Sequence, residues 1–145
     1  MRKLLLVDDD PGILRGLKWS LEQYELITAG NRIEALELFR EHRPKVVTLD
    51  LGLPPAVDDA SEGLAALDAI LALEPNTKVI VVSGNADRTN AVVAVGRGAA
   101  DFYHKPIDAE ILALLIARAF TVFDLEEENR RLRRAGNHTS HGILT

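Results

Sequence analysis

Five side chains of this sequence, far apart along the chain, are of the types that carry out metal and phosphoryl chemistry. They are Asp8, Asp9, Asp50, Ser83 and Lys105, and each stands at or just after the end of a short apolar run. Carboxylates that lie close together repel unless a cation joins them, and a hard ion with oxygen ligands, Mg²⁺ before Ca²⁺, suits such a set. A carboxylate can also act as a nucleophile, to which a hydroxyl and an ammonium group add hydrogen bonds and charge. These residue types predict a metal-assisted phosphoryl site, provided that the fold brings them together.

Taken singly, each of these residues has a simpler structural explanation. An acidic run such as Asp8 to Asp10 is often a solvated loop end or the negative charge that favours a helix N-terminus. Asp50 could cap a loop, Ser83 could cap a turn or helix, and Lys105 could be an ordinary surface lysine. The case for a site therefore depends on the elements that would carry these residues to one place.

Short apolar runs that alternate with helical patterns supply those elements. The expected strands are 3–7, 26–28, 46–49, 79–82 and 100–104, and the expected helices are about 11–23, 33–39, 64–73, 88–97 and 109–134. Either Gly96 or Gly98 could supply a left-handed cap after the fourth helix. Five alternations predict an α/β fold, a doubly wound parallel sheet with right-handed crossovers. The carboxyl edge of such a sheet is where sites form, and all five side chains would lie there.

The composition limits the classes of protein to consider. The 145 residues, 47% of them hydrophobic, suit one domain with a full core. A net charge of −5 argues against direct nucleic-acid binding, because such surfaces are usually basic. Zero cysteines exclude disulfides and thiolate chemistry and are compatible with a reducing cytoplasm. The apolar start ends too soon for a signal peptide and no segment suits a bilayer span, so we expect a cytoplasmic protein without membrane contact.

The motifs at the strand ends resemble those of the response-regulator receiver domains of two-component signalling. The matching segments are Val7-Asp8-Asp9-Asp10-Pro11, Asp50 with Pro54 four positions on, Ser83-Gly84, and Phe102-Tyr103-His104-Lys105-Pro106. The resemblance covers about residues 2–120 and implies a five-stranded, flavodoxin-like sheet of strand order 2-1-3-4-5 with an extended C-terminal helix.

The resemblance implies a phosphoacceptor and a metal. Asp50 would accept the phosphoryl group of a sensor histidine kinase. Mg²⁺ would contact Asp9, Asp50 and the backbone carbonyl of Gly52, and Asp8 would act on it through water. The protein would then be a signalling switch rather than an enzyme, although it would assist its own phosphorylation and slow dephosphorylation.

The resemblance also implies the groups that respond to the phosphoryl group. Ser83 and Lys105 would bind its oxygens, and Phe102 would be the aromatic side chain that repositions when Ser83 moves inward. Phenylalanine lacks a hydroxyl and so does not supply the hydrogen-bond readout of a tyrosine at this position. Tyr103 would point to the opposite face of the strand.

The segment after Asp50 departs from the family pattern. The usual turn is Pro-x-x-Asp-Gly, whereas here eight residues, 55–62, separate Pro54 from Gly63. Several of them are acidic and the loop borders the predicted site. We therefore expect the loop 54–62 to alter kinase choice or phosphoryl lifetime.

Beyond the receiver, a heptad pattern continues along the last helix. The series is Ile111, Leu115, Arg118, Val122, Leu125, Asn129 and Leu132. Leucine at d positions with asparagine at an a position favours parallel two-stranded pairing. We expect a homodimer through Val122, Leu125, Asn129 and Leu132. The alternative is a solvated helix extension, because Arg118 interrupts the seam and few heptads follow.

Two segments are similar to narrower groups within the family. The run Asp124 to Leu132 is similar to the signalling helix that joins receivers to AAA+ domains in NtrC-type activators of sigma-54 transcription. The segments 61–64 and 82–88 are similar to PEP-CTERM-associated response regulators. The first similarity implies AAA+ and DNA-binding output domains in the full-length protein. We divide the chain into a receiver (1–120), a helix extension (121–134) and a disordered native tail or artificial addition (135–145).

Two other functions fit part of the sequence. A small Mg²⁺-dependent phosphohydrolase would use the same nucleophile, but neither a substrate pocket nor a turnover base is evident. A phosphorylation-independent dimerisation module would retain the acidic residues as vestiges. Multiple turnover of a phosphate ester would identify the first, and a dimer indifferent to Asp50→Asn would identify the second.

Overall fold

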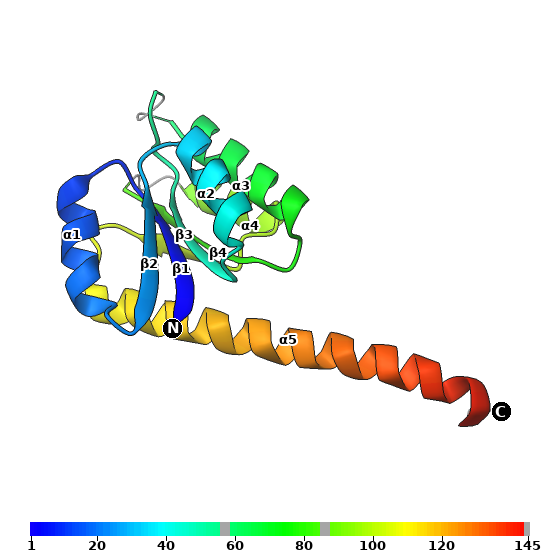
Figure 1. Ribbon diagram of the computed structural model, residues 1–145. Coiled ribbons are helices and arrows are strands. Elements are labelled where there is room, and N and C mark those ends of the chain that lie inside the picture. Colours follow the sequence, from blue (N-terminus) through cyan, green and yellow to red (C-terminus); the bar gives the residue numbers. More distant parts are fainter. Residues whose placement is uncertain (56–58, 85–87, 144–145) are drawn as a thin grey trace.

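The apolar runs form a single parallel sheet in the computed structural model, which describes residues 1–55, 59–84 and 88–143 (Figure 1). The strands are β1 (Arg2–Val7), β2 (Tyr24–Ala29), β3 (Val46–Asp50), β4 (Lys78–Ser83) and β5 (Asp101–His104). Their order is β2-β1-β3-β4-β5, and every neighbouring pair is parallel. The predicted doubly wound, flavodoxin-like sheet is therefore confirmed.

Helices follow the strands in turn and cover both faces of the sheet. They are α1 (Pro11–Ser20), α2 (Arg32–His42), α3 (Ser61–Leu73), α4 (Arg88–Gly96) and α5 (Ala109–Ile143). Side chains alternate along β1, so that Leu5 joins a buried cluster with residues of α2, α3 and α4, whereas Leu4 and Leu6 join a second cluster with α1 and α5. Both faces of the central strands are buried, which explains their continuous apolar sequences.

Local signals account for most helix boundaries. Asp10 caps α1, since its Oδ1 accepts a hydrogen bond of 2.8 Å from the Gly12 amide, with Pro11 at the first helical position. Of the two glycines considered for the cap after α4, Gly98 has the positive φ of 108°. The first helix is shorter than predicted and ends at Ser20 rather than near residue 23. The chain turns there because β2 begins at Tyr24, whose amide donates to the Leu21 carbonyl.

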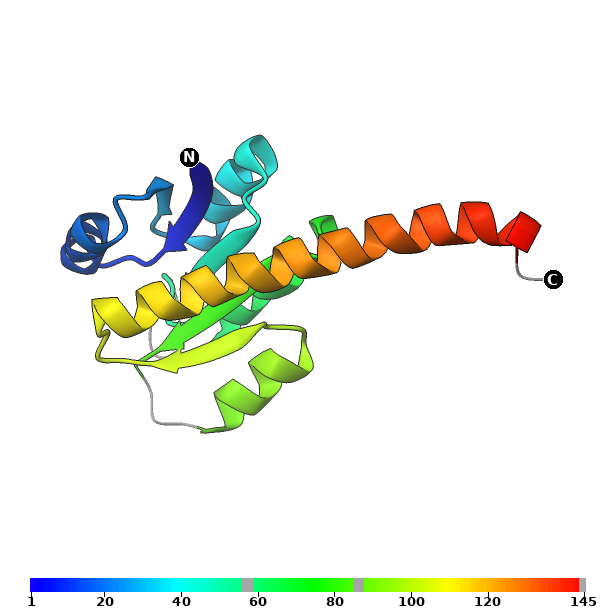
Figure 2. The ribbon, with the colours of Figure 1, turned by 90° about the horizontal axis from the view of Figure 1, so that it is seen from below.

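The last helix is longer than predicted. It lies along the sheet and then projects far beyond it (Figure 2). The backbone stays helical to Ile143, beyond the predicted end near residue 134, and the assignment of residues 135–145 stays a prediction. No proline follows Pro106 in the sequence, so no residue of that type interrupts the backbone hydrogen bonds of this helix. Residues 144–145 lie outside the described part, and the division into domains stays a prediction.

No helix within residues 1–55, 59–84 and 88–143 is both long enough and apolar enough to cross a bilayer.

Candidate functional site

The five predicted side chains meet in one cleft at the carboxyl edge of the sheet. Asp8 and Asp9 follow β1, Asp50 ends β3, Ser83 ends β4 and Lys105 follows β5. All five line the same cleft of about 680 Å³. The strand order explains the meeting, because β1, β3, β4 and β5 are consecutive neighbours and run in the same direction.

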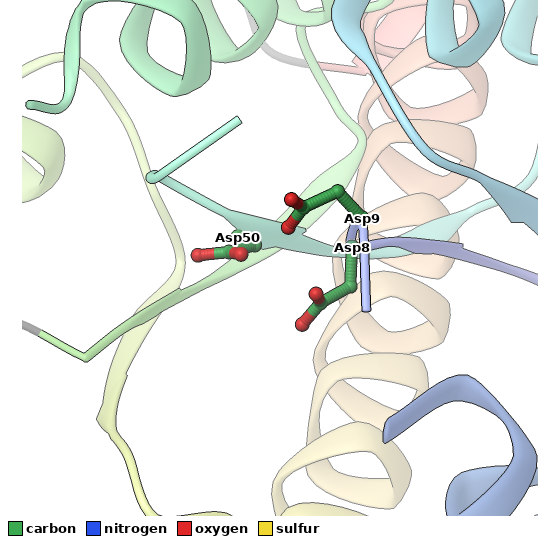
Figure 3. A group of neighbouring side chains, drawn as sticks. All are labelled: Asp8, Asp9 and Asp50. Atoms are coloured by element: carbon green, nitrogen blue, oxygen red, sulfur yellow. The ribbon is translucent and has the colours of Figure 1, made fainter. Parts of the chain in front are cut away.

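Three carboxylates form the acidic part of the cleft. Asp8, Asp9 and Asp50 each offer an oxygen atom, and these atoms lie within 4.8 Å of one another. Figure 3 shows their side chains projecting from the adjoining ends of β1 and β3 toward the same side. Asp8 and Asp50 are each 5% exposed, whereas Asp9 is open to solvent. Such a set fits a hard divalent cation that keeps water at its open positions.

The ammonium group of Lys105 bridges the two buried carboxylates. Its Nζ lies 3.3 Å from Oδ2 of Asp50 and 3.3 Å from Oδ2 of Asp8. Burial alone would lower the pKa of Lys105, but the carboxylates of Asp50 and Asp8 outweigh it and raise that pKa. Lys105 is therefore positively charged at neutral pH and offsets part of the negative charge.

Burial raises the pKa of a carboxyl group, whereas it lowers that of an ammonium group. It raises the pKa of Asp8, helped by the nearby charge of Asp50, although the Asp10 amide and Lys105 both stabilise the ionised form. The Asp10 amide donates a hydrogen bond of 2.9 Å to Oδ1 of Asp8. The negative charge of Asp8 is thus held at a cost, which a bound cation would reduce.

The chain just after Asp50 orients its carboxylate. The Gly52 amide donates a hydrogen bond of 3.1 Å to Oδ1 of Asp50, and Oδ2 faces Lys105. Gly52 lines the cleft, as expected of a residue whose carbonyl could contact a metal. The role of that carbonyl stays a prediction.

Ser83 lies at the end of β4, and Phe102 lies on the neighbouring strand β5. Ser83 is buried at the cleft, and its carbonyl accepts a hydrogen bond of 2.8 Å from the Lys105 amide. Phe102 packs against the buried cluster under α2, α3 and α4, whereas Tyr103 packs on the opposite face. The Tyr103 hydroxyl accepts a hydrogen bond of 2.7 Å from the Asp108 amide. The predicted opposite orientation of these two aromatic residues is confirmed, and the switching role of Phe102 stays a prediction.

Two polar residues of the cleft were not predicted individually. Asp59, at the end of the long loop, and Asn90, in the first turn of α4, both line it. The acidic composition of the loop pointed toward Asp59 only in general terms. No sequence signal marked Asn90, because the helical phase of α4 against the sheet depends on tertiary packing. Residues 56–58 of the loop and 85–87 of the segment used for the narrower resemblance lie outside the described residues.

The predicted dimer residues lie on the outer side of α5. Leu125 is 66% exposed and Leu132 is 58% exposed, and both Val122 and Asn129 are also open to solvent. Leu125, Asn129 and Leu132 therefore form a stripe open to solvent, and Val122, 37% exposed, lies at its edge beside a hollow that Lys78 and Asp101 also line.

Comparison with known proteins agrees with this arrangement. A model of the response regulator receiver domain family matches residues 4–117. The regulatory protein AtoC of Escherichia coli (strain K12) is 32% identical over 137 residues, which cover 93% of this chain and 29% of AtoC. The nitrogen assimilation regulatory protein NtrX of Azorhizobium caulinodans is 34% identical over 134 residues, which cover 90% of this chain and 29% of NtrX. Both are regulators of the NtrC type.

Solved structures show the same fold. The crystal structure of NtrX from Brucella abortus superposes with a TM-score of 0.81 at 34% identity, covering 90% of this chain and 30% of that one. A CheY-like receiver domain protein from Methanospirillum hungatei gives a TM-score of 0.79 at 29% identity and covers 87% of this chain and 98% of that one. This chain spans less than a third of the NtrC-type relatives that it matches.

Proposed function

Because the chain belongs to the response regulator receiver domain family, we propose that it accepts a phosphoryl group from a sensor histidine kinase on Asp50. The observation that carries the proposal is the position of this carboxylate. Asp50 ends a buried strand and lines a cleft. It lies beside two further carboxylates and the ammonium group of Lys105.

In the proposed transfer, the phosphoryl group passes from the phosphohistidine of the kinase to Asp50. An oxygen of Asp50 forms a bond to phosphorus while the bond from phosphorus to the imidazole nitrogen of the phosphohistidine breaks, and the electron pair leaves with that nitrogen. Lys105 stabilises negative charge on the phosphoryl oxygens, and the Ser83 hydroxyl offers them a hydrogen bond.

Mg²⁺ is the metal that these ligands would hold. Asp9, Asp50 and the Gly52 carbonyl would contact it, and Asp8 would act through water. When bound, the ion supplies positive charge that neutralises phosphoryl oxygens. The convergence of three carboxylate oxygens within 4.8 Å supports this assignment.

The output of the switch is proposed from the exposed face of α5 and from the relatives. Phosphorylation would draw Ser83 inward, allow Phe102 to repack, and change the geometry of a homodimer formed along Val122, Leu125, Asn129 and Leu132. AAA+ and DNA-binding domains would follow in the full-length protein, which would act in the cytoplasm. The similarity to PEP-CTERM-associated regulators stays a prediction.

Phosphorylation by a small phosphodonor tests the central claim. Wild-type protein incubated with acetyl phosphate and Mg²⁺ should gain the mass of one phosphoryl group, and the gain should disappear with EDTA or in Asp50→Asn. Asp68→Asn, which removes a carboxylate that does not line this cleft, should behave as wild type. Unchanged labelling of Asp50→Asn in intact-mass spectra would defeat the assignment. Continuous release of phosphate from an ester would instead indicate a phosphohydrolase.

A further inference from the structure

The long loop after Asp50 returns to the cleft because the start of α3 is pressed against β3. A Cβ atom placed on Gly63 would lie 2.3 Å from the Cα of Leu51, the residue directly after Asp50. Only glycine allows this approach. Ala60, at the start of α3, is also buried, in the cluster that contains Leu51. The described end of the loop is therefore held close to the phosphoacceptor.

Asp59 is oriented by the first residue of α3. Its Oδ1 accepts hydrogen bonds from the Ser61 amide at 2.9 Å and the Ser61 hydroxyl at 2.6 Å. These bonds lower the pKa of Asp59, so its carboxylate is ionised at neutral pH. The side chain is exposed and lines the cleft that contains Asp50.

Asp59 also lies where two hollows meet. Together with Ala60 and Asn90 it lines both the Asp50 cleft and a neighbouring groove between α3 and α4. A small phosphodonor bound in the cleft therefore shares its lining with the Asp59 carboxylate.

The charges that line the cleft are mostly negative. Its described lining contains five carboxylates, Asp8, Asp9, Asp10, Asp50 and Asp59, and one ammonium group, that of Lys105. Asp8 and Asp50 face Lys105, and Asp10 caps α1. Asp59 accepts hydrogen bonds from Ser61 but forms no ion pair with a described side chain, so its negative charge acts on an anion bound in the cleft.

We propose that Asp59 is a specificity-determining residue, which slows phosphoryl transfer to Asp50 from small dianionic donors by electrostatic repulsion. The inference rests on the proposed function of Asp50. In the step concerned, an Asp50 oxygen bonds to phosphorus, the bond from phosphorus to the bridging oxygen of acetyl phosphate breaks, and the electron pair leaves on acetate. A donor of lower net charge, such as phosphoramidate, is opposed less, and a kinase offsets the repulsion with its own contacts.

Matched removal of one charge tests the inference. Asp59→Asn keeps an oxygen that can accept from Ser61, whereas Asp68→Asn removes the same charge from the neighbouring groove, where Asp68 pairs with Arg97 at 2.9 Å. Rates of phosphorylation are measured with acetyl phosphate and with phosphoramidate, at Mg²⁺ concentrations that saturate each variant. At low ionic strength Asp59→Asn should react with acetyl phosphate about threefold to fivefold faster than wild type, as expected for one unit charge roughly 10 Å from a dianion in water.

Three further results are expected. The gain with phosphoramidate should be smaller, Asp68→Asn should stay close to wild type, and the Asp59→Asn gain should shrink as salt screens the charge. Equal rates for the two variants, a slower Asp59→Asn, or a gain that persists at high salt would each overturn the inference while leaving the phosphoacceptor intact. A wild-type protein that accepts no phosphoryl group from either donor overturns the proposed function, and the inference with it.

Discussion

The guanidinium group of Arg2 pairs with the carboxylate of Asp124 through two contacts of 2.8 Å, across 122 positions of the chain. The same guanidinium lies 4.2 Å from the centroid of the Phe120 ring, which stacks on Tyr24. Arg2 is the first residue of β1, and Asp124 lies on the part of α5 that has passed the core. The amino-terminal edge of the sheet therefore holds the beginning of the helix extension.

Residues at the start of two more strands also contact the helix extension. Lys78, the first residue of β4, pairs with Glu126 at 2.5 Å. Lys45, which precedes β3, lies 5.0 Å from the centroid of the Phe123 ring. These contacts use the inner side of α5 and leave the predicted dimer stripe on the outer side.

Loss of the Arg2 contacts should loosen the helix extension. Arg2→Ala removes a half-exposed bidentate ion pair and a stacking interaction, and we expect the free energy of unfolding to fall by about 1–2 kcal/mol. Hydrogen exchange should rise in residues 121–130. As a control, Arg131→Ala removes only an exposed pair with Glu128 within the helix and should leave the free energy of unfolding close to that of wild type. Equal exchange in the two variants would show that the contacts of Arg2 with Asp124 and Phe120 do not hold the helix extension.

The same pair should make stability depend on acid. The hydrogen bonds from Arg2 lower the pKa of Asp124 below its ordinary value of 3.8. A carboxyl whose folded pKa is lowered stabilises the fold above the unfolded pKa and loses that contribution as pH falls through the folded pKa. Because the pair is half-exposed, the free energy of unfolding of wild type should exceed that of Asp124→Asn by less than about 1 kcal/mol at pH 7. Urea unfolding should show the difference closing as pH falls below 3.8; a constant difference would count against this linkage.

Two glycines should respond oppositely to alanine. In Gly63→Ala the new Cβ would collide with the Leu51 backbone at 2.3 Å, so we expect a loss of about 2–4 kcal/mol in the free energy of unfolding. In Gly16→Ala, on the exposed side of α1, the Cβ would meet nothing within 4 Å, and helix propensity should give a gain of up to about 1 kcal/mol. Chemical denaturation measures both, and a neutral Gly63→Ala would show that the start of α3 can move.

Removal of the bridging ammonium should make stability depend on the metal. Lys105→Met leaves the buried carboxylates of Asp8 and Asp50 facing each other, and we expect a loss of about 1–2 kcal/mol in EDTA, reduced from fully buried values because the cleft is open. Mg²⁺ should restore more stability to this variant than it adds to wild type. Lys18→Met, at the exposed end of α1, changes the same charge and should show no added Mg²⁺ dependence. Thermal unfolding with and without Mg²⁺ decides between these outcomes.

The exposed seam of α5 should control self-association. Leu125→Ala combined with Leu132→Ala should weaken the dimer by at least tenfold while leaving the monomer folded, because both side chains are mostly exposed. Leu114→Ala changes a leucine that is 71% exposed on the same helix but outside the heptad series, and should keep the wild-type association. Sedimentation equilibrium gives the dissociation constants. Unchanged association of the double variant would show that the seam is not the interface.

The sheet and the meeting of its functional side chains were predictable because both depend on local patterns. Alternating apolar runs and helical periods predict a doubly wound parallel sheet whose strand ends place Asp8, Asp50 and Ser83 at one edge, whereas the strand order followed from the resemblance to receiver domains. The two-residue period likewise predicted that Phe102 and Tyr103 face opposite clusters.

Features that depend on long-range packing were not predictable. Asp59 reaches the cleft only because Gly63 packs against the Leu51 backbone, and a sequence pattern does not show that contact. The pair of Arg2 and Asp124 joins elements that are distant in the chain and carries no local signal. The end of α5 was also missed, since polar composition favoured a loop where the backbone continues as a helix.

Because α5 is unbroken, the number of residues after Asp124 determines the direction in which an attached module faces around the helix axis. With 3.6 residues per turn, each inserted or deleted residue rotates everything beyond it by about 100° around the helix axis. An insertion of seven residues nearly restores the original direction, whereas an insertion of two turns an attached module almost to the far side. Chimeras that join this receiver to another protein through α5 should therefore be designed by helical phase, with the junction beyond Arg130, and not by linker length alone.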